Sequence, residues 1–257
     1  MRFALSVPPF RSPTDVLALA AEAEANGWDG VFLWDHLRWD DRVDVHDPWT
    51  LLGAFAVGTS RIRIGTMVTP LARRRPWVVA KHLVTLDHLS GGRAILGVGL
   101  GDPPDLDFGD FGDEPSYRTR AQITDESLDV LVGLLEGSVT HRGEHLAVTA
   151  AMKPPPVQRP RPPIWIAGRA PNRPPLERAR RWDGYVPISR QFLAPDELAE
   201  YIGPHPRDDW DLVAQWKPGV PADEYADAGA TWLVRSCNPA EDGWFDELHE
   251  LASSAPG

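Results

Sequence analysis

Short apolar runs alternate along the chain with longer segments in which apolar and polar residues are mixed. Short apolar runs have the length and composition of buried strands, and they cover residues 2–7, 30–34, 62–68, 93–99, 164–167, 184–188, 211–215 and 231–235. Between these runs, apolar residues return at intervals of three and four, which is the spacing of one helix face. Strands that alternate with helices predict a parallel sheet covered by helices.

The helical segments carry recognisable start signals. Ser12 before Pro13 and Asp15 is typical of an N-cap and a first helical turn. Further helices are predicted at 48–57, 77–89, 120–135, 172–182, 195–202, 221–228 and 240–251. Eight strand–helix units in 257 residues suggest one (β/α)8 barrel domain spanning 1–257, because such a barrel commonly takes about 250 residues. Periodicity alone does not separate a closed barrel from an open sheet.

Three segments interrupt this rhythm. Residues 102–120 mix acidic residues with Gly, Pro and Phe, which indicates a long loop after the fourth strand. Residues 140–148 resemble a hairpin. Residues 154–163 contain six prolines, and because proline fits neither a helix interior nor a central strand, we expect an extended surface strap there.

Composition and charge narrow the function classes. A formal net charge of -11 argues against a nucleic-acid partner, which needs a basic face, although local backbone amides could still bind a cofactor phosphate. No run approaches the roughly 20 apolar residues of a membrane span. Cys237 is the single cysteine, which fits a reducing compartment. No signal-peptide pattern is present. We therefore expect a cytoplasmic enzyme that acts on a small molecule.

A metal site is not expected. His141 and His145 are four residues apart, but Gly143 lies between them in a segment that resembles a hairpin. The spacing does not match the helical metal-binding motif of two histidines around a glutamate.

Candidate chemistry gathers where the predicted strands end. In a (β/α)8 barrel the active site lies at the carboxyl ends of the strands, which selects segments 6–8, 34–36, 67–69, 99–102 and 167–169. Asp35 and His36 are adjacent there, and an acid beside an imidazole could handle protons near neutral pH. The alternative is a histidine that only bonds the backbone of a loop.

The glycines at 97, 99 and 101 partly match a dinucleotide-binding fingerprint. Asp102 stands where the third glycine is required, and Pro103-Pro104 replace the helix start that would hold a pyrophosphate. The Rossmann interpretation is therefore weak. Glycines at a strand end still allow a ring or phosphate to approach the backbone closely.

The segment from Arg73 to Asp102 closely resembles the signature segment of the luciferase-like monooxygenase superfamily. The resemblance extends over nearly the whole chain and is strongest at 28–36, 62–101 and 154–169. Members of the superfamily are (β/α)8 barrels that hold flavin mononucleotide (FMN) or the deazaflavin coenzyme F420. The resemblance implies a closed barrel, here a compact version with a loop insertion after strand 4, and a homodimer.

The resemblance also implies roles for individual residues. F420-dependent members carry an Asp-His pair where Asp35 and His36 stand, with the Asp near the deazaflavin ring and the His near the site of hydride transfer. They carry an acid where Asp102 stands, which donates a proton or positions the cofactor; the alternative is that Asp102 only begins a solvated acidic loop. FMN luciferases carry a phosphate-binding basic residue where Leu100 stands, so this chain favours F420.

Further cofactor contacts follow from strand ends and from the resemblance. Met67-Val68 matches a non-prolyl cis peptide bulge that supports the deazaflavin ring, and Trp34 and Trp39 should lie nearest the pocket. The segment 73–75, with three arginines, is either a basic patch for the acidic tail of F420 or a solvated loop. The full set of expected cofactor-binding residues is Ser6, Met67, Val68, Gly99, Leu100, Gly101, Ala167, Gly168 and Arg169.

These observations predict an oxidoreductase that transfers hydride between F420 and an organic substrate. Asp35, His36 and Asp102 are its expected catalytic residues. One alternative is an FMN-dependent monooxygenase that uses reduced flavin and oxygen. An alternative of another class is a non-catalytic flavin-binding protein. Sugar-phosphate substrates are disfavoured, because the chain has only three lysines (Lys81, Lys153 and Lys217).

Overall fold

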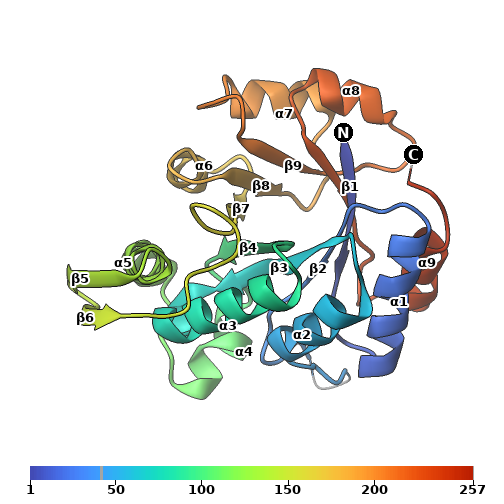
Figure 1. Ribbon diagram of the computed structural model, residues 1–257. Helices are drawn as coiled ribbons and strands as arrows, with labels where there is room; N and C mark the ends of the chain where they lie inside the picture. Colours follow the sequence, from blue (N-terminus) through green and yellow to red (C-terminus); the bar gives the residue numbers. More distant parts are fainter. Residues whose placement is uncertain (41–42, 257) are drawn as a thin grey trace.

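The computed structural model describes residues 1–40 and 43–256, and its main feature is a closed barrel of eight parallel strands (Figure 1). Around the barrel the strands follow the order β1-β10-β9-β8-β7-β4-β3-β2. Their bounds are β1 Arg2–Val7, β2 Gly30–Leu33, β3 Arg63–Pro70, β4 Ala94–Gly99, β7 Ile164–Arg169, β8 Gly184–Ile188, β9 Asp211–Gln215 and β10 Trp232–Arg235. The predicted barrel and all eight predicted strands are confirmed.

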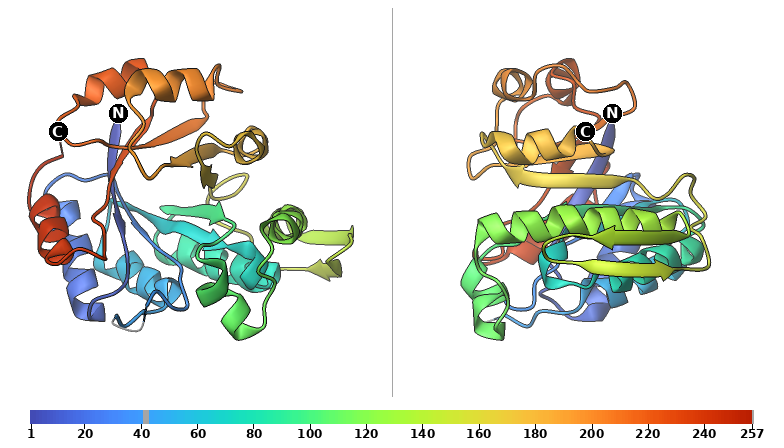
Figure 2. Two further views of the ribbon diagram at one scale, coloured as in Figure 1. Left: turned by 180° about the vertical axis from the view of Figure 1, so that it is seen from behind. Right: turned by 90° about the vertical axis from the view of Figure 1, so that its left-hand side faces the viewer.

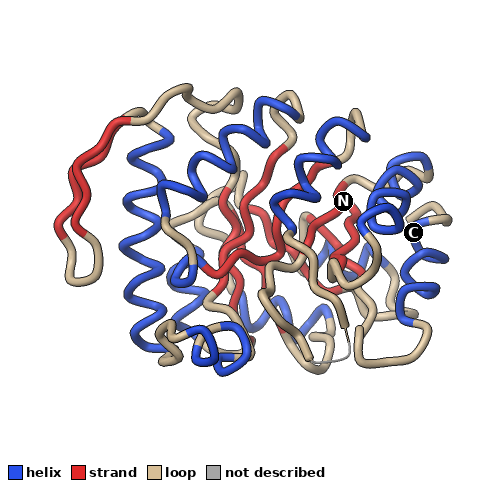
Figure 3. The backbone as a smooth tube through the Cα atoms, turned by 90° about the horizontal axis from the view of Figure 1, so that it is seen from below, coloured by secondary structure: helices blue, strands red, loops and turns tan. Residues whose placement is uncertain are grey.

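Helices surround the barrel strands, which gather at the centre of the molecule (Figure 3). The helix bounds are α1 Pro13–Ala25, α2 Pro48–Gly58, α3 Pro76–Leu89, α5 Tyr117–Leu135, α6 Arg173–Ala179, α7 Pro195–Ile202, α8 Ala222–Asp227 and α9 Trp244–Ala252. The predicted start of α1 is confirmed, because the Ser12 hydroxyl accepts a hydrogen bond from the Asp15 amide at 3.2 Å. Among the described residues, no helix is both long enough and apolar enough to cross a bilayer.

The expected loop at 102–120 is partly helical instead. It contains α4 (Pro104–Asp107) and the 3-10 helix η2 (Gly109–Phe111), and α5 already begins at Tyr117. The physical reason is Phe108, which is fully buried and draws this segment onto the barrel.

The predicted hairpin is confirmed as β5 (Ser138–Arg142) and β6 (Ala147–Ala151), which pair antiparallel. The hairpin projects from the barrel beside α5 (Figure 2). Glu126 of α5 joins the two, because its carboxylate accepts hydrogen bonds from the backbone amides of residues 144, 145 and 146 at 2.7–3.1 Å. Burial raises the pKa of Glu126, but these bonds outweigh that effect and the pKa is lowered.

The barrel interior is packed rather than open. Phe32, Trp165 and Trp232 lie in contact there, with ring centroids 5.2–6.0 Å apart, and all three are fully buried. Because large side chains fill the interior, ligand chemistry is confined to the ends of the strands.

The proline-rich strap at 154–163 lies against α3, as expected for an extended surface segment. Asp87 of α3 accepts hydrogen bonds from the backbone amides of Val157 and Gln158 at 2.7 and 2.9 Å. These bonds satisfy strap amides that have no strand partner, so the strap holds its position without belonging to the sheet.

Candidate active site

Aromatic side chains surround His36 where β1 and β2 end. The His36 ring centroid lies 5.0 Å from that of Trp39, 6.0 Å from that of Trp34 and 6.3 Å from that of Phe10. The indole N–H of Trp34 donates a hydrogen bond to Ser6 Oγ at 2.8 Å. Four residues predicted for the site (Ser6, Trp34, His36 and Trp39) are therefore brought together. We call Phe10, Trp34 and Trp39 the aromatic wall.

Asp35 precedes His36 in the chain and its side chain is fully buried. Its carboxylate accepts hydrogen bonds from Thr69 Oγ1 at 2.9 Å, Arg73 Nη2 at 2.8 Å, and Arg74 Nε and Nη2 at 2.8 and 2.7 Å. Both oxygens are therefore engaged by neighbouring side chains. The structure places Asp35 as an anchor between the end of β2 and the turn after β3, and any influence on a bound ring acts through these neighbours.

The arginines of segment 73–75 do not form a solvated basic loop. The side chain of Arg73 is 3% exposed, and it bridges two carboxylates, with Nη2 2.8 Å from Asp35 Oδ1 and Nη1 3.0 Å from Asp107 Oδ2. Arg74 is also turned inward onto Asp35, whereas Arg75 lies over the ring of Trp77. The expectation of a basic patch or solvated loop is therefore wrong for Arg73 and Arg74, because two buried acids attract them.

Asp107 is a further site residue that the sequence alone does not single out. Its Oδ2 lies 2.7 Å from Nδ1 of His36, and its Oδ1 accepts hydrogen bonds from the backbone amides of Leu37 and Arg38 at 2.9 and 3.3 Å. Burial raises the pKa of Asp107, but the bond to His36 and the charge of Arg73 dominate, and the pKa is lowered. The sequence offers no signal that separates Asp107 from the acidic residues around it, because its burial depends on the tertiary packing of Phe108.

Asp102 lies elsewhere, across the ends of β4 and β7. Its two carboxylate oxygens accept hydrogen bonds from Tyr117 Oη and from Arg169 Nη2. The side chains of Asp102 and Arg169 are 47% and 55% exposed. The structure thus brings together an expected catalytic acid and an expected phosphate-binding cation, and each offsets the charge of the other.

The glycine turn after β4 packs tightly against the end of β3. A Cβ on Gly99 would lie 2.4 Å from Val68 Cγ2, and one on Gly101, whose φ is +80°, would lie 2.6 Å from Phe108. The Met67-Val68 peptide bond is cis, as predicted. Buried Arg120 donates hydrogen bonds to the carbonyls of Leu100 and Gly101 at 2.8 and 3.1 Å. The predicted residues of β3 and β4 therefore form one compact shelf.

The turn after β7 is equally constrained. A Cβ on Gly168 would lie 2.0 Å from Pro175 Cβ, so only glycine fits. Ala167 before it is buried in the barrel. Backbone amides at a helix start can hold a phosphate, but Pro174 and Pro175 occupy the first turn of α6. Because proline has no N–H, this helix start offers fewer donors to a phosphate than an ordinary one.

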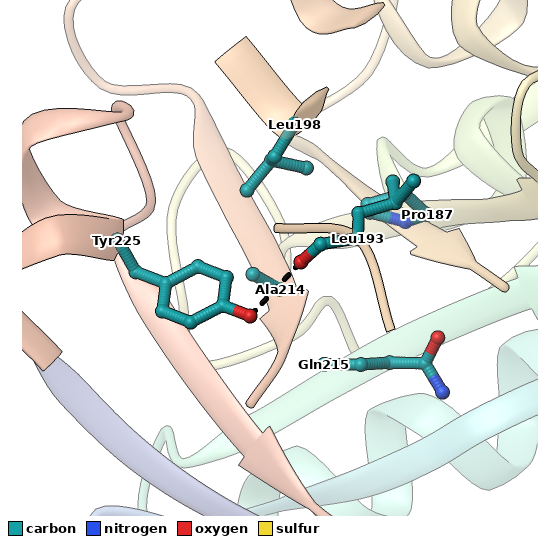
Figure 4. A pocket seen from close by; sticks show the side chains of 6 residues that line it. All are labelled: Pro187, Leu193, Leu198, Ala214, Gln215 and Tyr225. Atoms are coloured by element: carbon teal, nitrogen blue, oxygen red, sulfur yellow. Dashed lines mark hydrogen bonds between the residues drawn. The ribbon is translucent and has the colours of Figure 1, made fainter. Parts of the chain in front are cut away.

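Phe108 connects the two halves of the site. The guanidinium carbon of Arg73 lies 5.8 Å from its ring centroid, and that of Arg120 lies 4.1 Å from it. A separate small pocket lies between the later strands and helices and is lined by Pro187, Leu193, Leu198, Ala214, Gln215 and Tyr225 (Figure 4). None of the predicted site residues line that pocket, so we place the candidate site around His36 and the β3–β4 shelf.

A closed barrel with polar side chains gathered where its strands end defines the class of (β/α)8-barrel proteins that carry their sites at the carboxyl face. The family model for luciferase-like monooxygenases matches residues 1–203. The chain therefore belongs to the luciferase-like monooxygenase family, as its resemblance predicted.

Several of the curated relatives carry coenzyme F420 in their names. An F420-dependent glucose-6-phosphate dehydrogenase from Segniliparus rotundus is 33% identical over 138 residues, which are 52% of this chain and 41% of that protein. The chain spans less than half the length of the curated relatives that it matches.

The solved structures that share the fold include proteins with different named cofactors. The F420-dependent tetrahydromethanopterin reductase from Methanopyrus kandleri has a TM-score of 0.77 and 19% identity, covering 99% of this chain and 98% of that one. The oxygenating constituent of 3,6-diketocamphane monooxygenase from Pseudomonas putida, in complex with FMN, has a TM-score of 0.67 and 18% identity, covering 93% of this chain and 67% of that one. At these identities the likeness concerns the fold alone.

Proposed function

We propose that this chain is an oxidoreductase that binds coenzyme F420 at the carboxyl ends of its strands and transfers hydride between the cofactor and an organic substrate. The observation that carries the proposal is His36, whose side chain is 14% exposed inside the aromatic wall. Its Nδ1 is engaged by Asp107 at 2.7 Å, which leaves Nε2 as the ring nitrogen available to a substrate. The names of the relatives support the same reaction class.

The shelf of β3 and β4 suits a flat ring. Met67 and Val68 are partly buried and pack against the barrel-interior cluster, and Gly99 lets Val68 pack directly against the end of β4, because a Cβ there would lie 2.4 Å from Val68 Cγ2. Such a surface accepts a planar apolar face close to the backbone. When bound there, the cofactor would supply the hydride acceptor or donor, and the protein supplies orientation and electrostatics.

His36 has a defined task in this scheme. With Nδ1 engaged, Nε2 can accept a proton from a substrate hydroxyl or return one to a carbonyl oxygen as hydride moves. The aromatic wall excludes water from the imidazole and strengthens its polar interactions. Asp35 does not reach the substrate in this scheme, because its oxygens are held by Thr69 and two arginines.

Two features bear on the choice between F420 and FMN. Leu100 is uncharged where FMN luciferases carry a basic residue, which favours F420. Arg169 is the cation expected to bind the phosphate, and Asp102 already engages it, so a phosphate would have to displace that carboxylate. FMN-dependent monooxygenation remains the second candidate, because a neighbour of the same fold holds FMN.

Binding titrations with oxidised F420 and with FMN test the proposal. Trp34 and Trp39 line the site, so tryptophan fluorescence should fall as either cofactor binds. We expect F420 to bind more tightly than FMN. Tighter FMN binding would favour the monooxygenase, and binding of neither would contradict both. A protein that binds F420 but oxidises no alcohol in a substrate screen, with binding unchanged in His36→Ala, would favour a non-catalytic flavin-binding protein.

A further inference from the structure

Asp107 makes four polar contacts, and each of its oxygens has a separate set. Oδ1 accepts the backbone amides of Leu37 and Arg38 at 2.9 and 3.3 Å, while Oδ2 faces His36 Nδ1 at 2.7 Å and Arg73 Nη1 at 3.0 Å. The side chain is fully buried. Because an ionised carboxylate only accepts hydrogen bonds, the close contact with Nδ1 requires that nitrogen to carry its proton.

We infer that Asp107 is a positioning residue that holds neutral His36 as the Nδ1–H tautomer and so presents an unprotonated Nε2 to the substrate. The inference rests on the proposed function for its catalytic consequence, but the tautomer itself is a property of the protein without cofactor. A neutral imidazole has one N–H and one acceptor nitrogen, and the partner of the first decides the role of the second. Only the acceptor form of Nε2 can take a proton from a hydroxyl.

The position of Asp107 is in turn held by charge. Arg73 joins Asp107 to Asp35, and Arg74 engages Asp35 from the other side. Asp107 therefore keeps a cationic partner whether or not His36 is protonated. A carboxylate held in this way can orient the imidazole and stabilise the imidazolium without taking its proton, which is the division of roles known from serine-protease triads.

The element that supplies Asp107 is the segment inserted after β4. His36 and Asp107 are 71 residues apart in the chain, and the neighbouring Phe108 is fully buried between the Arg73 and Arg120 guanidiniums. The packing of Phe108 therefore sets where Asp107 lies. The inserted segment supports the histidine of the site in addition to shaping its surroundings.

Nitrogen NMR of histidine-labelled protein tests the tautomer directly. The His36 signals are assigned by their absence in His36→Gln, and the spectrum is recorded without cofactor at a pH where the imidazole is neutral. We expect Nδ1 protonated and Nε2 unprotonated in the unaltered protein. The opposite tautomer, or a mixture of both, would overturn the inference even if no variant of Asp107 folds.

Asp107→Asn should reverse the tautomer. The amide oxygen would stay at the Oδ1 position, where two backbone amides donate, so the NH2 group would face Nδ1 and make it an acceptor. Asp110→Asn is the matched control, because Asp110 lies on the same segment and pairs with Arg38 at the surface. It should leave the tautomer unchanged. An unchanged tautomer in Asp107→Asn would contradict the inference.

Kinetics give the second readout. With F420 and a substrate alcohol, Asp107→Asn should lose on the order of 10²-fold in kcat, the scale of one general-base contribution, while KM and F420 affinity stay within a factor of about three. Asp110→Asn should match the unaltered protein. If the tautomer behaves as expected but F420 does not bind, the proposed function fails and the positioning role stands. If kcat is unaffected by a reversed tautomer, the catalytic part of the inference is wrong.

Discussion

At the residue scale, the guanidinium of Arg73 links the two buried carboxylates of the site. It is 3% exposed and lies between Asp35 and Asp107. Burying three charged groups is costly unless every partner is present. The fold is therefore sensitive to single substitutions at this cluster, and loss of the Asp35 carboxylate should lower the free energy of unfolding.

Asp35→Asn measures that sensitivity. The substitution would leave Arg73 and Arg74 facing a neutral amide in a buried setting. We expect the free energy of unfolding to fall by about 3 kcal/mol, within the range for breaking a buried ion pair. Asp110→Asn, which removes an exposed pair with Arg38, should cost less than about 1 kcal/mol. Urea denaturation measures the free energy of unfolding of both variants. Equal losses would show that the Asp35 cluster stabilises the fold no more than an exposed ion pair does.

The site residues at the strand ends could be predicted, because a (β/α)8 barrel carries its active site there. Ser6, Trp34 and His36 follow directly from the boundaries of β1 and β2. The inward turn of Arg73 was not predictable, because three consecutive arginines normally indicate solvent and only the buried acids around them reverse that expectation. Asp107 was not predictable for a related reason. It lies among several acidic residues, and only its burial in the folded protein distinguishes it from them.

At the scale of elements, periodicity was informative wherever a strand or helix buries a continuous face. All eight barrel strands were predicted from their apolar runs, and α7 was predicted with its exact bounds, Pro195–Ile202. The helix α4 was not predicted, because four residues are too few to show a helical period. Its conformation depends on Phe108 reaching the barrel, which is a tertiary contact and leaves no local pattern.

The β5–β6 hairpin provides a test at this scale. Glu126→Gln removes the charge that receives three hairpin amides, so hydrogen exchange at residues 144–146 should accelerate about tenfold or more, since a charge-assisted bond contributes about 1.5–3 kcal/mol. Global stability should change much less, because the hairpin projects from the barrel. Exchange rates that do not change would show that strand pairing alone holds the hairpin.

The same carboxylate gives the hairpin a pH dependence. The pKa of Glu126 is lowered from its ordinary value of 4.5 in the folded protein. Its stabilising contribution is therefore complete above about pH 4.5 and is lost as the pH falls through the lower folded pKa. Exchange at residues 144–146, corrected for intrinsic rates, should accelerate below that pH in the unaltered protein but not in Glu126→Gln.

At the scale of the whole molecule, the proposed function requires an acidic protein with net charge -11 to bind an anionic cofactor. The Asp102–Arg169 pair shows this problem directly, because the Asp102 carboxylate neutralises the charge of Arg169 before any phosphate binds. The exposure of both side chains allows the pair to open at small cost. Cofactor affinity should then depend on how readily Asp102 releases Arg169.

Asp102→Asn tests this competition. Removing the carboxylate charge frees Arg169, so F420 and FMN should both bind a few-fold more tightly, whereas Arg169→Ala should weaken both. The effect should shrink as salt is added, because the groups are exposed. Isothermal titration at two ionic strengths measures it. Weaker binding by Asp102→Asn would instead assign Asp102 a direct role in holding the cofactor.

The position of Phe108 has a practical consequence for engineering the proposed activity. Loop grafting is a common way to change the specificity of a barrel, and the stretch between β4 and α5 is an obvious target. Here that stretch also carries Phe108, whose ring contacts two arginines, and Asp107, whose carboxylate orients the His36 imidazole. A transplanted loop would therefore have to keep Asp107 and Phe108 in register, or the new pocket would be built around a misaligned base.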